Sequence, residues 1–226
     1  MRGISQYNMP GIRAVIFDLD GTLIDSERIT LKAYLEAGGE LGYPVTEEIM
    51  LGLIGLDSRS SEQRLIEHLG PSFSYKALRA RAHEIRSRMG LELKAGAADM
   101  LQFVKDSGLR CGLATSTRIA YVEVILDALD LRKYFDTYVG GDQVARGKPA
   151  PEIYLRAASQ LGIAPEDCVA FEDSEPGLRS AIAAGMCVIH VPDLRVLPLE
   201  VQGLAFAVEP SLVSAKVVLK KLLTKD

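Results

Sequence analysis

Short apolar runs alternate with longer amphipathic stretches along most of this sequence, and that alternation constrains the fold more than any other feature. Four apolar runs are bounded by turn residues, at Ala14–Phe17, Cys111–Thr115, Cys168–Phe171 and Cys187–Val191, and two weaker ones lie at Tyr138–Val139 and Ala205–Val208. Helical periods lie between them, at Ala97–Ser107, Ala120–Leu129, Glu152–Leu161, Ser174–Ala184 and Ser211–Leu223. Strand followed by helix, repeated, is typical of a parallel sheet with helices on both faces. We therefore expect an α/β fold whose core is a doubly wound, Rossmann-like parallel sheet.

One segment, from about Glu27 to Leu93, breaks this alternation because it contains no convincing strand. Its helical periods lie at Glu27–Leu41, Glu47–Leu53, Ser61–Leu69 and Tyr75–Met89, separated by glycine and proline. We expect an inserted all-helical cap domain at residues 25–93, with the core formed by residues 1–24 and 94–226. Ligands bind at the carboxyl ends of the strands in such sheets, so an insert that leaves from that end would act as a lid.

Composition narrows the class of protein. The chain has 226 residues, 48% of them hydrophobic, which is enough for a full core. A net charge of −4 argues against a protein that binds nucleic acid or acidic membranes through a general basic surface. The three cysteines have no metal-binding spacing, and the first thirteen residues have no apolar stretch typical of a signal peptide. We expect a cytoplasmic protein with a loose start of about ten residues, and nothing in the sequence demands more than a monomer.

Polar residues that could take part in catalysis or ligand binding follow the expected strands. They are Asp18 and Asp20 after the first strand, Thr115-Ser116-Thr117 after the second, Lys148 in a later loop, and Glu172-Asp173 after another strand. In a parallel sheet these sets converge on one edge. Two unit charges about 4 Å apart cost roughly 4 kcal/mol at an effective dielectric near 20, so clustered carboxylates require compensating positive charge.

Lys148 supplies one positive charge, and a divalent cation would supply the rest. Oxygen ligands without histidine or cysteine favour Mg²⁺ over Zn²⁺. A phosphate group would explain the hydroxyls, because Thr115 and Ser116 are expected at the start of a helix, where free N–H groups bind anions. Thr115 would also cap that helix.

Two aspartates separated by one residue suit phosphoryl transfer. This reaction needs an in-line nucleophile and neutralisation of the equatorial oxygens. Asp18 is the natural nucleophile and would form an aspartyl-phosphate. Asp20 would protonate the leaving oxygen and then deprotonate the attacking water.

Together these residues resemble the haloacid dehalogenase superfamily. Its four motifs match Asp18-Leu19-Asp20-Gly21-Thr22, then Thr115, then Lys148, and then Glu172-Asp173, in the family's order and over nearly the whole chain. The stretches "FDLDGTLIDS", "GKPAPEIY" and "FEDSEPGLRSAIAAGM" are most similar to the β-phosphoglucomutase-like phosphatases, which have a small helical cap. The resemblance implies Mg²⁺ held by Asp18, the carbonyl of Asp20 and Asp173, with Glu172 nearby or coordinating.

The resemblance implies a Mg²⁺-dependent phosphatase for small phosphate monoesters. Sugar phosphates, phosphoglycolate and nucleoside monophosphates are all candidate substrates. A β-phosphoglucomutase is the enzyme alternative, although Glu27-Arg28-Ile29-Thr30 lacks the histidine that mutases of the group tend to carry there. A phospho-receiver signalling module is the non-enzyme alternative, although a receiver has its phosphorylated aspartate on a middle strand and no helical insert.

The loop Gly55–Arg59 lies between the expected cap helices. By resemblance, Arg59 could bind substrate. Alternatively, Ser58 caps a helix and Arg59 is merely exposed.

Overall fold

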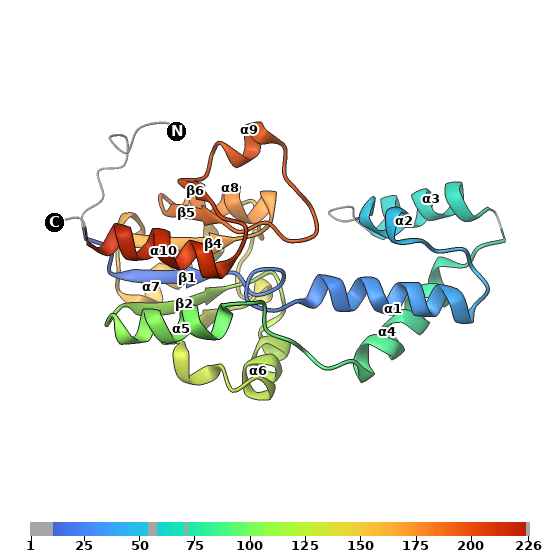
Figure 1. The fold of residues 1–226 in the computed structure, drawn as a ribbon, viewed down its shortest axis with the longest axis horizontal. Helices are drawn as coiled ribbons and strands as arrows, with labels where there is room; N and C mark the ends of the chain where they lie inside the picture. Colours follow the sequence, from blue (N-terminus) through green and yellow to red (C-terminus); the bar gives the residue numbers. More distant parts are fainter. Residues whose placement is uncertain (1–10, 54–57, 71, 225–226) are drawn as a thin grey trace. The chain divides into compact units, whose positions relative to one another are not determined.

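A six-stranded parallel sheet forms the core of the protein in the computed structural model, which describes residues 11–53, 58–70 and 72–224 (Figure 1). The strands are β1 (Ala14–Phe17), β2 (Arg110–Ala114), β3 (Thr137–Val139), β4 (Cys168–Glu172), β5 (Cys187–His190) and β6 (Ala207–Val208). Their order in the sheet is β3-β2-β1-β4-β5-β6, and all pairs are parallel. The predicted fold class, a Rossmann-like α/β core, is confirmed.

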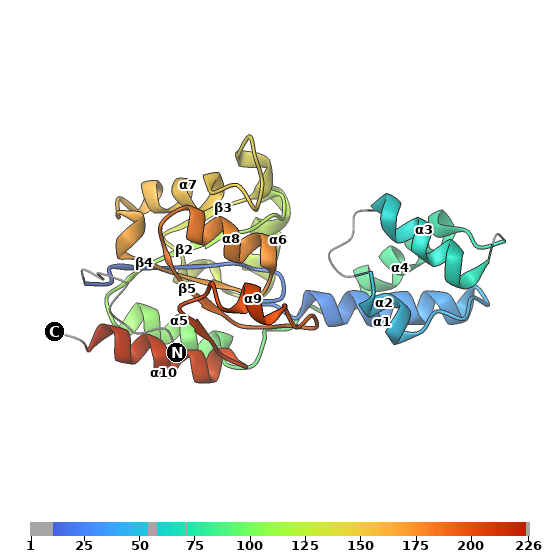
Figure 2. The same cartoon turned by 90° about the horizontal axis from the view of Figure 1, so that it is seen from above.

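Helices cover both faces of this sheet (Figure 2). One face packs against α5 (Ala97–Asp106), α6 (Ile119–Ala128) and α10 (Leu212–Leu223). The other packs against α7 (Glu152–Leu161), α8 (Glu175–Ala183) and the short α9 (Leu199–Gln202). The sequence analysis missed α9, because a helix of four residues is too short to show a helical period.

The first strand shows why the sheet is buried on both sides. Val15 and Phe17 belong to the cluster on one face, and Ala14 and Ile16 belong to the cluster on the other. All four are fully buried, so the strand has no polar side, as expected for a parallel sheet between helical layers. The first polar side chain after it is Asp18, at the carboxyl end of the strand.

The chain divides into two compact units, one formed by Met1–Ile24 with Glu92–Asp226 and the other by Asp25–Leu91. The second unit contains α1 (Ser26–Glu40), α2 (Glu47–Leu51), α3 (Ser58–Leu69) and α4 (Tyr75–Arg88). Its described residues include no strand, and its buried core is built around Ala33, Leu65 and Leu78. Thr46 and Ser74 cap α2 and α4 by accepting backbone N–H bonds.

Both ends of the helical segment join the sheet unit at one place. Ile24 and Leu93 form an antiparallel bridge, and the Lys94 N–H donates to the Leu23 carbonyl at 2.9 Å. Lys94 also forms an ion pair with Asp193 in the loop after β5. The two crossings are therefore fixed beside each other just beyond the carboxyl end of β1.

The three cysteines, Cys111, Cys168 and Cys187, are buried free thiols. Among the described residues, we find no helix with the length and apolar character needed to cross a membrane. The first ten residues, expected to be loose, lie outside the described part of the chain.

Candidate active site

Asp18 is fixed at the end of β1 by its backbone. Its N–H donates to the Phe171 carbonyl on β4 at 3.0 Å, so the parallel ladder continues one residue past the strand. The residue is only 6% exposed. Its carboxylate is therefore held at the carboxyl edge of the sheet, between the two central strands.

Lys148 connects two of the carboxylates. Its Nζ donates to Asp18 Oδ1 and to Glu172 Oε1, each at 2.5 Å. The Lys148 side chain is 5% exposed and that of Glu172 is fully buried, so these ion pairs are shielded from water. Such charge-assisted hydrogen bonds are strong, and the lysine is well placed to neutralise charge at this edge.

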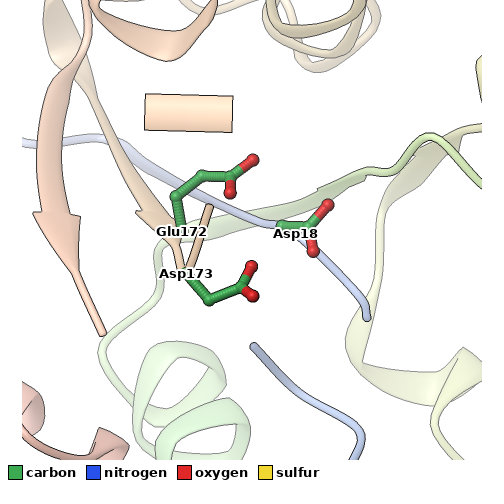
Figure 3. A group of neighbouring side chains, drawn as sticks. All are labelled: Asp18, Glu172 and Asp173. Carbon is green, nitrogen blue, oxygen red and sulfur yellow. The ribbon is translucent and has the colours of Figure 1, made fainter. Parts of the chain in front are cut away.

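Asp18, Glu172 and Asp173 form one acidic cluster, shown in Figure 3, in which one carboxylate oxygen from each lies within 4.8 Å of the others. Thr22 Oγ1 donates to Asp173 Oδ1 at 3.3 Å. Gly21 has a φ of +80°, and a Cβ on it would come within 2.3 Å of Asp173 Oδ2. The glycine after the aspartate pair is thus required both by the turn and by the close approach of Asp173.

Burial and charge act in opposite directions on the two central groups. Burial raises the pKa of Asp18 well above its ordinary value, Lys148 opposes this, and Glu172 raises it further. Burial lowers the pKa of Lys148, but Asp18 and Glu172 more than compensate, and the net shift is upward. Lys148 therefore stays charged, whereas Asp18 needs more positive charge than this lysine provides to be an effective anion.

Asp20 lies at the same edge, where the Thr117 hydroxyl donates to its Oδ2 at 2.6 Å. Thr117 belongs to the hydroxyl triplet after β2, so this bond connects the loop after β2 to the loop after β1. Thr115 is buried, and its Oγ1 accepts the Thr117 N–H at 3.1 Å. Ser116 is exposed.

The prediction that Thr115 caps the next helix is wrong. The N-cap of α6 is Arg118, which makes no side-chain capping bond, and the N–H of Ile119 instead donates to Asp142 Oδ1 at 2.8 Å. The three residues after β2 form a turn before the helix begins. Thr115 and Ser116 are thus loop residues, and the Thr115 hydroxyl stabilises that loop.

Three further polar side chains hold Glu172, and the sequence analysis did not single them out. Tyr154 Oη donates to Glu172 Oε1 at 2.7 Å, and Ser174 Oγ donates to Oε2 at 3.1 Å. His190 Nδ1 lies 3.0 Å from the Glu172 carbonyl oxygen, and the two residues are register partners in β5 and β4. Gly177 faces this carboxylate so closely that any side chain there would displace it.

Tyr154 is the most consequential of these residues. It is fully buried on α7, and burial raises its pKa well above the ordinary value, so the phenol keeps its proton and acts as a donor. Its ring also lies under Lys148, with Nζ 5.2 Å from the centroid. In the sequence, Tyr154 is indistinguishable from the apolar residues of the α7 stripe, so no local signal marks its role.

Replacing Tyr154→Phe should lower the free energy of unfolding by about 1.5–3 kcal/mol, the usual contribution of a hydrogen bond to a charged group. We also expect kcat of the reaction at this site to fall several-fold, because Glu172 and Lys148 lose a fixed neighbour. Chemical denaturation and steady-state assays measure the two effects. Tyr121→Phe is the matched control, since Tyr121 is 64% exposed. Equal stability of both variants would show that the hydrogen bond contributes nothing.

Arg59 is an exposed residue near the start of α3, in the helical unit. It lies within a helix rather than in the loop that we expected to carry it. Gly55, Leu56 and Asp57 of that loop lie outside the described residues.

The acidic cluster has the chemistry of a site for a hard divalent cation. All three of its side chains offer carboxylate oxygens, the donors that Mg²⁺ prefers. Lys148 contacts two of these carboxylates, Asp18 and Glu172. The donor set and its concentrated negative charge both fit a bound Mg²⁺.

Comparison with known proteins identifies one family that this chain matches. Residues 12–185 match a protein family described as haloacid dehalogenase-like hydrolases. This range contains both aspartates of the first motif, Lys148 and the Glu172-Asp173 pair.

Individual relatives are similar over most of the chain. A Thermotoga maritima protein named phosphorylated carbohydrates phosphatase is 40% identical over 178 residues, 77% of this chain and 82% of that protein. The fructose-1-phosphate phosphatase YqaB of Escherichia coli is 34% identical over 180 residues, 78% of this chain and 95% of that protein. A Thermotoga maritima crystal structure, provisionally described as a β-phosphoglucomutase, has a TM-score of 0.79 and 35% identity. It covers 93% of this chain and 99% of its own.

Proposed function

Because the chain belongs to the haloacid dehalogenase-like hydrolases and is an enzyme of their phosphatase type, we propose that it hydrolyses small phosphate monoesters with Mg²⁺ through an aspartyl-phosphate. One observation carries the proposal. A buried nucleophile candidate, Asp18, shares Lys148 with Glu172 and lies in a cluster of three carboxylates at the end of the central strands. The match to a hydrolase family argues against the phospho-receiver alternative.

The side chains of Asp18, Asp173 and Glu172 and the backbone carbonyl of Asp20 would hold the metal. When bound, Mg²⁺ supplies positive charge that allows Asp18 to act as an anion near a negatively charged phosphate. Thr115, Ser116 and Lys148 would bind the phosphate oxygens. Lys148 also fixes the orientation of the Asp18 carboxylate, because the Lys148 Nζ donates to Asp18 Oδ1.

The reaction has two steps at this edge. Asp18 attacks phosphorus, and Asp20, in its acid form, gives its proton to the leaving oxygen, so that an alcohol departs and an aspartyl-phosphate remains. Asp20, now a carboxylate, takes a proton from water as the water attacks phosphorus. This step releases inorganic phosphate and regenerates both aspartates. The Thr117 hydroxyl fixes Asp20 for both transfers.

A carbohydrate phosphate is the substrate class we favour, because two relatives are named as phosphatases of phosphorylated carbohydrates and of fructose 1-phosphate. We propose that residues 25–93 act as a cap that selects among such substrates. Phosphate release should be assayed with p-nitrophenyl phosphate and a panel of sugar phosphates, with Mg²⁺ or with EDTA. We expect phosphate release in the presence of Mg²⁺ and none in the presence of EDTA. No release from any monoester in Mg²⁺ would refute the proposal.

A β-phosphoglucomutase activity is the second candidate, favoured by the similarity to the Thermotoga maritima structure. A mutase uses the same aspartyl-phosphate but returns the phosphoryl group to a sugar. Incubation with β-glucose 1-phosphate separates the two activities. A phosphatase releases inorganic phosphate, whereas a mutase forms glucose 6-phosphate.

Asp20→Asn should affect substrates unequally, because only poor leaving groups need a proton from Asp20. We expect kcat/KM for a sugar phosphate to fall by about 10²–10⁴-fold, the usual contribution of general acid–base catalysis, and the first step with p-nitrophenyl phosphate to fall far less. Burst kinetics with p-nitrophenyl phosphate isolate that step. If the rate of the first step fell equally for the two substrates, Asp20 would not be the general acid.

A further inference from the structure

The strand β5 ends in a buried histidine, His190. The other three residues of the strand, Cys187 to Ile189, are apolar, and all four are buried between the helical layers. Strands in such a position normally carry apolar side chains throughout. His190 is fully buried, so its two ring nitrogens depend on the protein for hydrogen-bond partners.

One of these two nitrogens has a partner among the described residues. His190 Nδ1 lies 3.0 Å from the Glu172 carbonyl oxygen, and because a carbonyl oxygen can only accept, Nδ1 carries the proton and donates. His190 Nε2 is buried and has no hydrogen-bond partner in the described part of the chain. A buried polar atom without a partner costs stability, and an apolar side chain would avoid that cost. Packing alone therefore does not account for a histidine here.

The carbonyl group of Glu172 does not need this histidine to satisfy its oxygen. The oxygen already accepts the Val191 N–H at 2.8 Å, the regular bond of the parallel ladder between β4 and β5. His190 adds a second donor, from a side chain, to an oxygen that is already paired. The backbone of His190 is itself fixed, because its carbonyl accepts the Glu209 N–H at 2.9 Å. The peptide group after Glu172 is thus held by two donors.

That peptide group joins two members of the acidic cluster, Glu172 and Asp173. Both carboxylates extend from the end of β4 to the side where Asp18 lies (Figure 3), and one oxygen from each of the three lies within 4.8 Å of the others. Rotation of the peptide would turn the Asp173 Cα–Cβ bond and change the spacing of these oxygens. Groups that orient metal ligands typically change metal affinity by about 10–100-fold.

We propose that His190 is a positioning residue for the metal ligands: by holding the peptide between Glu172 and Asp173, it raises the affinity of the acidic cluster for a divalent cation. The inference rests on the proposed function, because it takes the cluster to be the metal site of the phosphatase. It gives the histidine a role in metal binding that the stability of the sheet does not require.

Two substitutions in the full chain, His190→Leu and His190→Asn, test this role. Leucine fills the position without polar atoms, whereas the amide nitrogen of asparagine can take the place of Nδ1. The probe is Mn²⁺, which, like Mg²⁺, suits carboxylate ligands, and electron paramagnetic resonance of the free ion follows its binding to metal-free protein. We expect the affinity for Mn²⁺ to fall about tenfold in His190→Leu and to recover to within about threefold in His190→Asn.

Thermal unfolding without metal should rank the two variants in the opposite order. His190→Leu removes the unpartnered Nε2 and leaves the Glu172 carbonyl bonded to Val191, so we expect a melting temperature equal to or above that of the unmodified protein. His190→Asn leaves a smaller side chain in a buried position and should melt lower. His190→Met replaces the leucine variant if leucine does not fit.

The matched control is His68→Leu. His68 Nδ1 also lies against a backbone carbonyl oxygen, that of Arg64 at 2.7 Å, but the residue is exposed on α3. We expect this variant to bind Mn²⁺ as tightly as the unmodified protein.

Three results would overturn the role of His190. The apolar variants could bind Mn²⁺ as tightly as the unmodified protein, the asparagine variant could bind it as weakly as the leucine variant, or the affinities could fall in the same order as the melting temperatures. Any of these, with normal binding by the unmodified protein, removes only the role of the histidine. An unmodified protein that binds no Mn²⁺ removes the metal from the proposed function as well.

Discussion

Asp18→Asn should lower kcat for phosphate monoesters at least a thousandfold, which corresponds to about 4 kcal/mol of activation free energy. A carboxamide is nearly the same size as a carboxylate but is a far weaker nucleophile, so the first step would lose its attacking atom. The fold should survive the change. Burial already raises the pKa of this aspartate, which means that its surroundings favour a neutral side chain, and Lys148 keeps Glu172 as a partner. Steady-state kinetics and thermal unfolding measure the two effects.

The matched control for this prediction is Asp99→Asn. Asp99 lies on α5 with a side chain that is 79% exposed, so the substitution removes the same charge from a solvated position outside the acidic cluster. We expect activity and melting temperature close to those of the unmodified protein. An Asp18→Asn variant that kept activity within tenfold would show that another group attacks phosphorus.

Lys148→Met should destabilise the fold more than any other substitution at the site that keeps the side-chain volume. Removing one partner of a buried ion pair typically costs about 3–5 kcal/mol, because the remaining charge is left uncompensated. Here two buried carboxylates, Asp18 and Glu172, would lose their shared cation. Methionine keeps most of the side-chain volume, so the loss reports on charge rather than on a cavity. Urea denaturation without divalent metal measures it, and activity should fall with it.

The destabilisation should depend on pH. Without Lys148 the pKa of Asp18 rises further above its unfolded value, since the lysine lowers it in the native protein. A carboxyl with a raised pKa favours the folded state at low pH, and this contribution is lost as the pH rises through the folded pKa. The variant should therefore be closer to the unmodified protein at pH 5 than at pH 8, and Mg²⁺ should recover part of the difference.

Lys133→Met provides the control for that series. Lys133 pairs with Asp130 at the surface, where ion pairs contribute little, so its loss should leave the unfolding curve nearly unchanged. If Lys148→Met were as stable as Lys133→Met at pH 8 without metal, the account of Lys148 as the central counter-charge would fail.

The parts of the fold that the sequence predicted are those with a strong pattern. Ala14–Phe17 was predicted with its observed ends, because four apolar residues stop at an aspartate. The edge strand β6 is shorter than the predicted Ala205–Val208, since it pairs with β5 alone through Ala207 and Val208. The short helix α9 (Leu199–Gln202) depends on the packing of Val201 against the sheet, and a helix of this length has no sequence period that would reveal it.

The same distinction applies to the site. Asp18, Lys148, Glu172 and Asp173 follow strands or lie in loops at the strand ends, so parallel topology alone suggested that they meet. Thr115 was assigned to a helix cap because hydroxyl residues often cap, but a turn delays α6 until Ile119, whose N–H is satisfied by Asp142. The role of Tyr154 depends on a contact between α7 and the end of β4. The two partners lie eighteen positions apart in the sequence, so no local pattern connects them.

Direct trapping of the phosphorylated residue tests the central claim most sharply. The enzyme would be mixed with a phosphate monoester and Mg²⁺, quenched in acid within one turnover, and treated with borohydride, which reduces an aspartyl-phosphate to homoserine. Peptide mass spectrometry then locates the reduced residue. We predict homoserine at position 18, dependent on substrate and metal and absent from Asp18→Asn. Substrate turnover with no homoserine at that position, or with homoserine at position 20 instead, would contradict the mechanism.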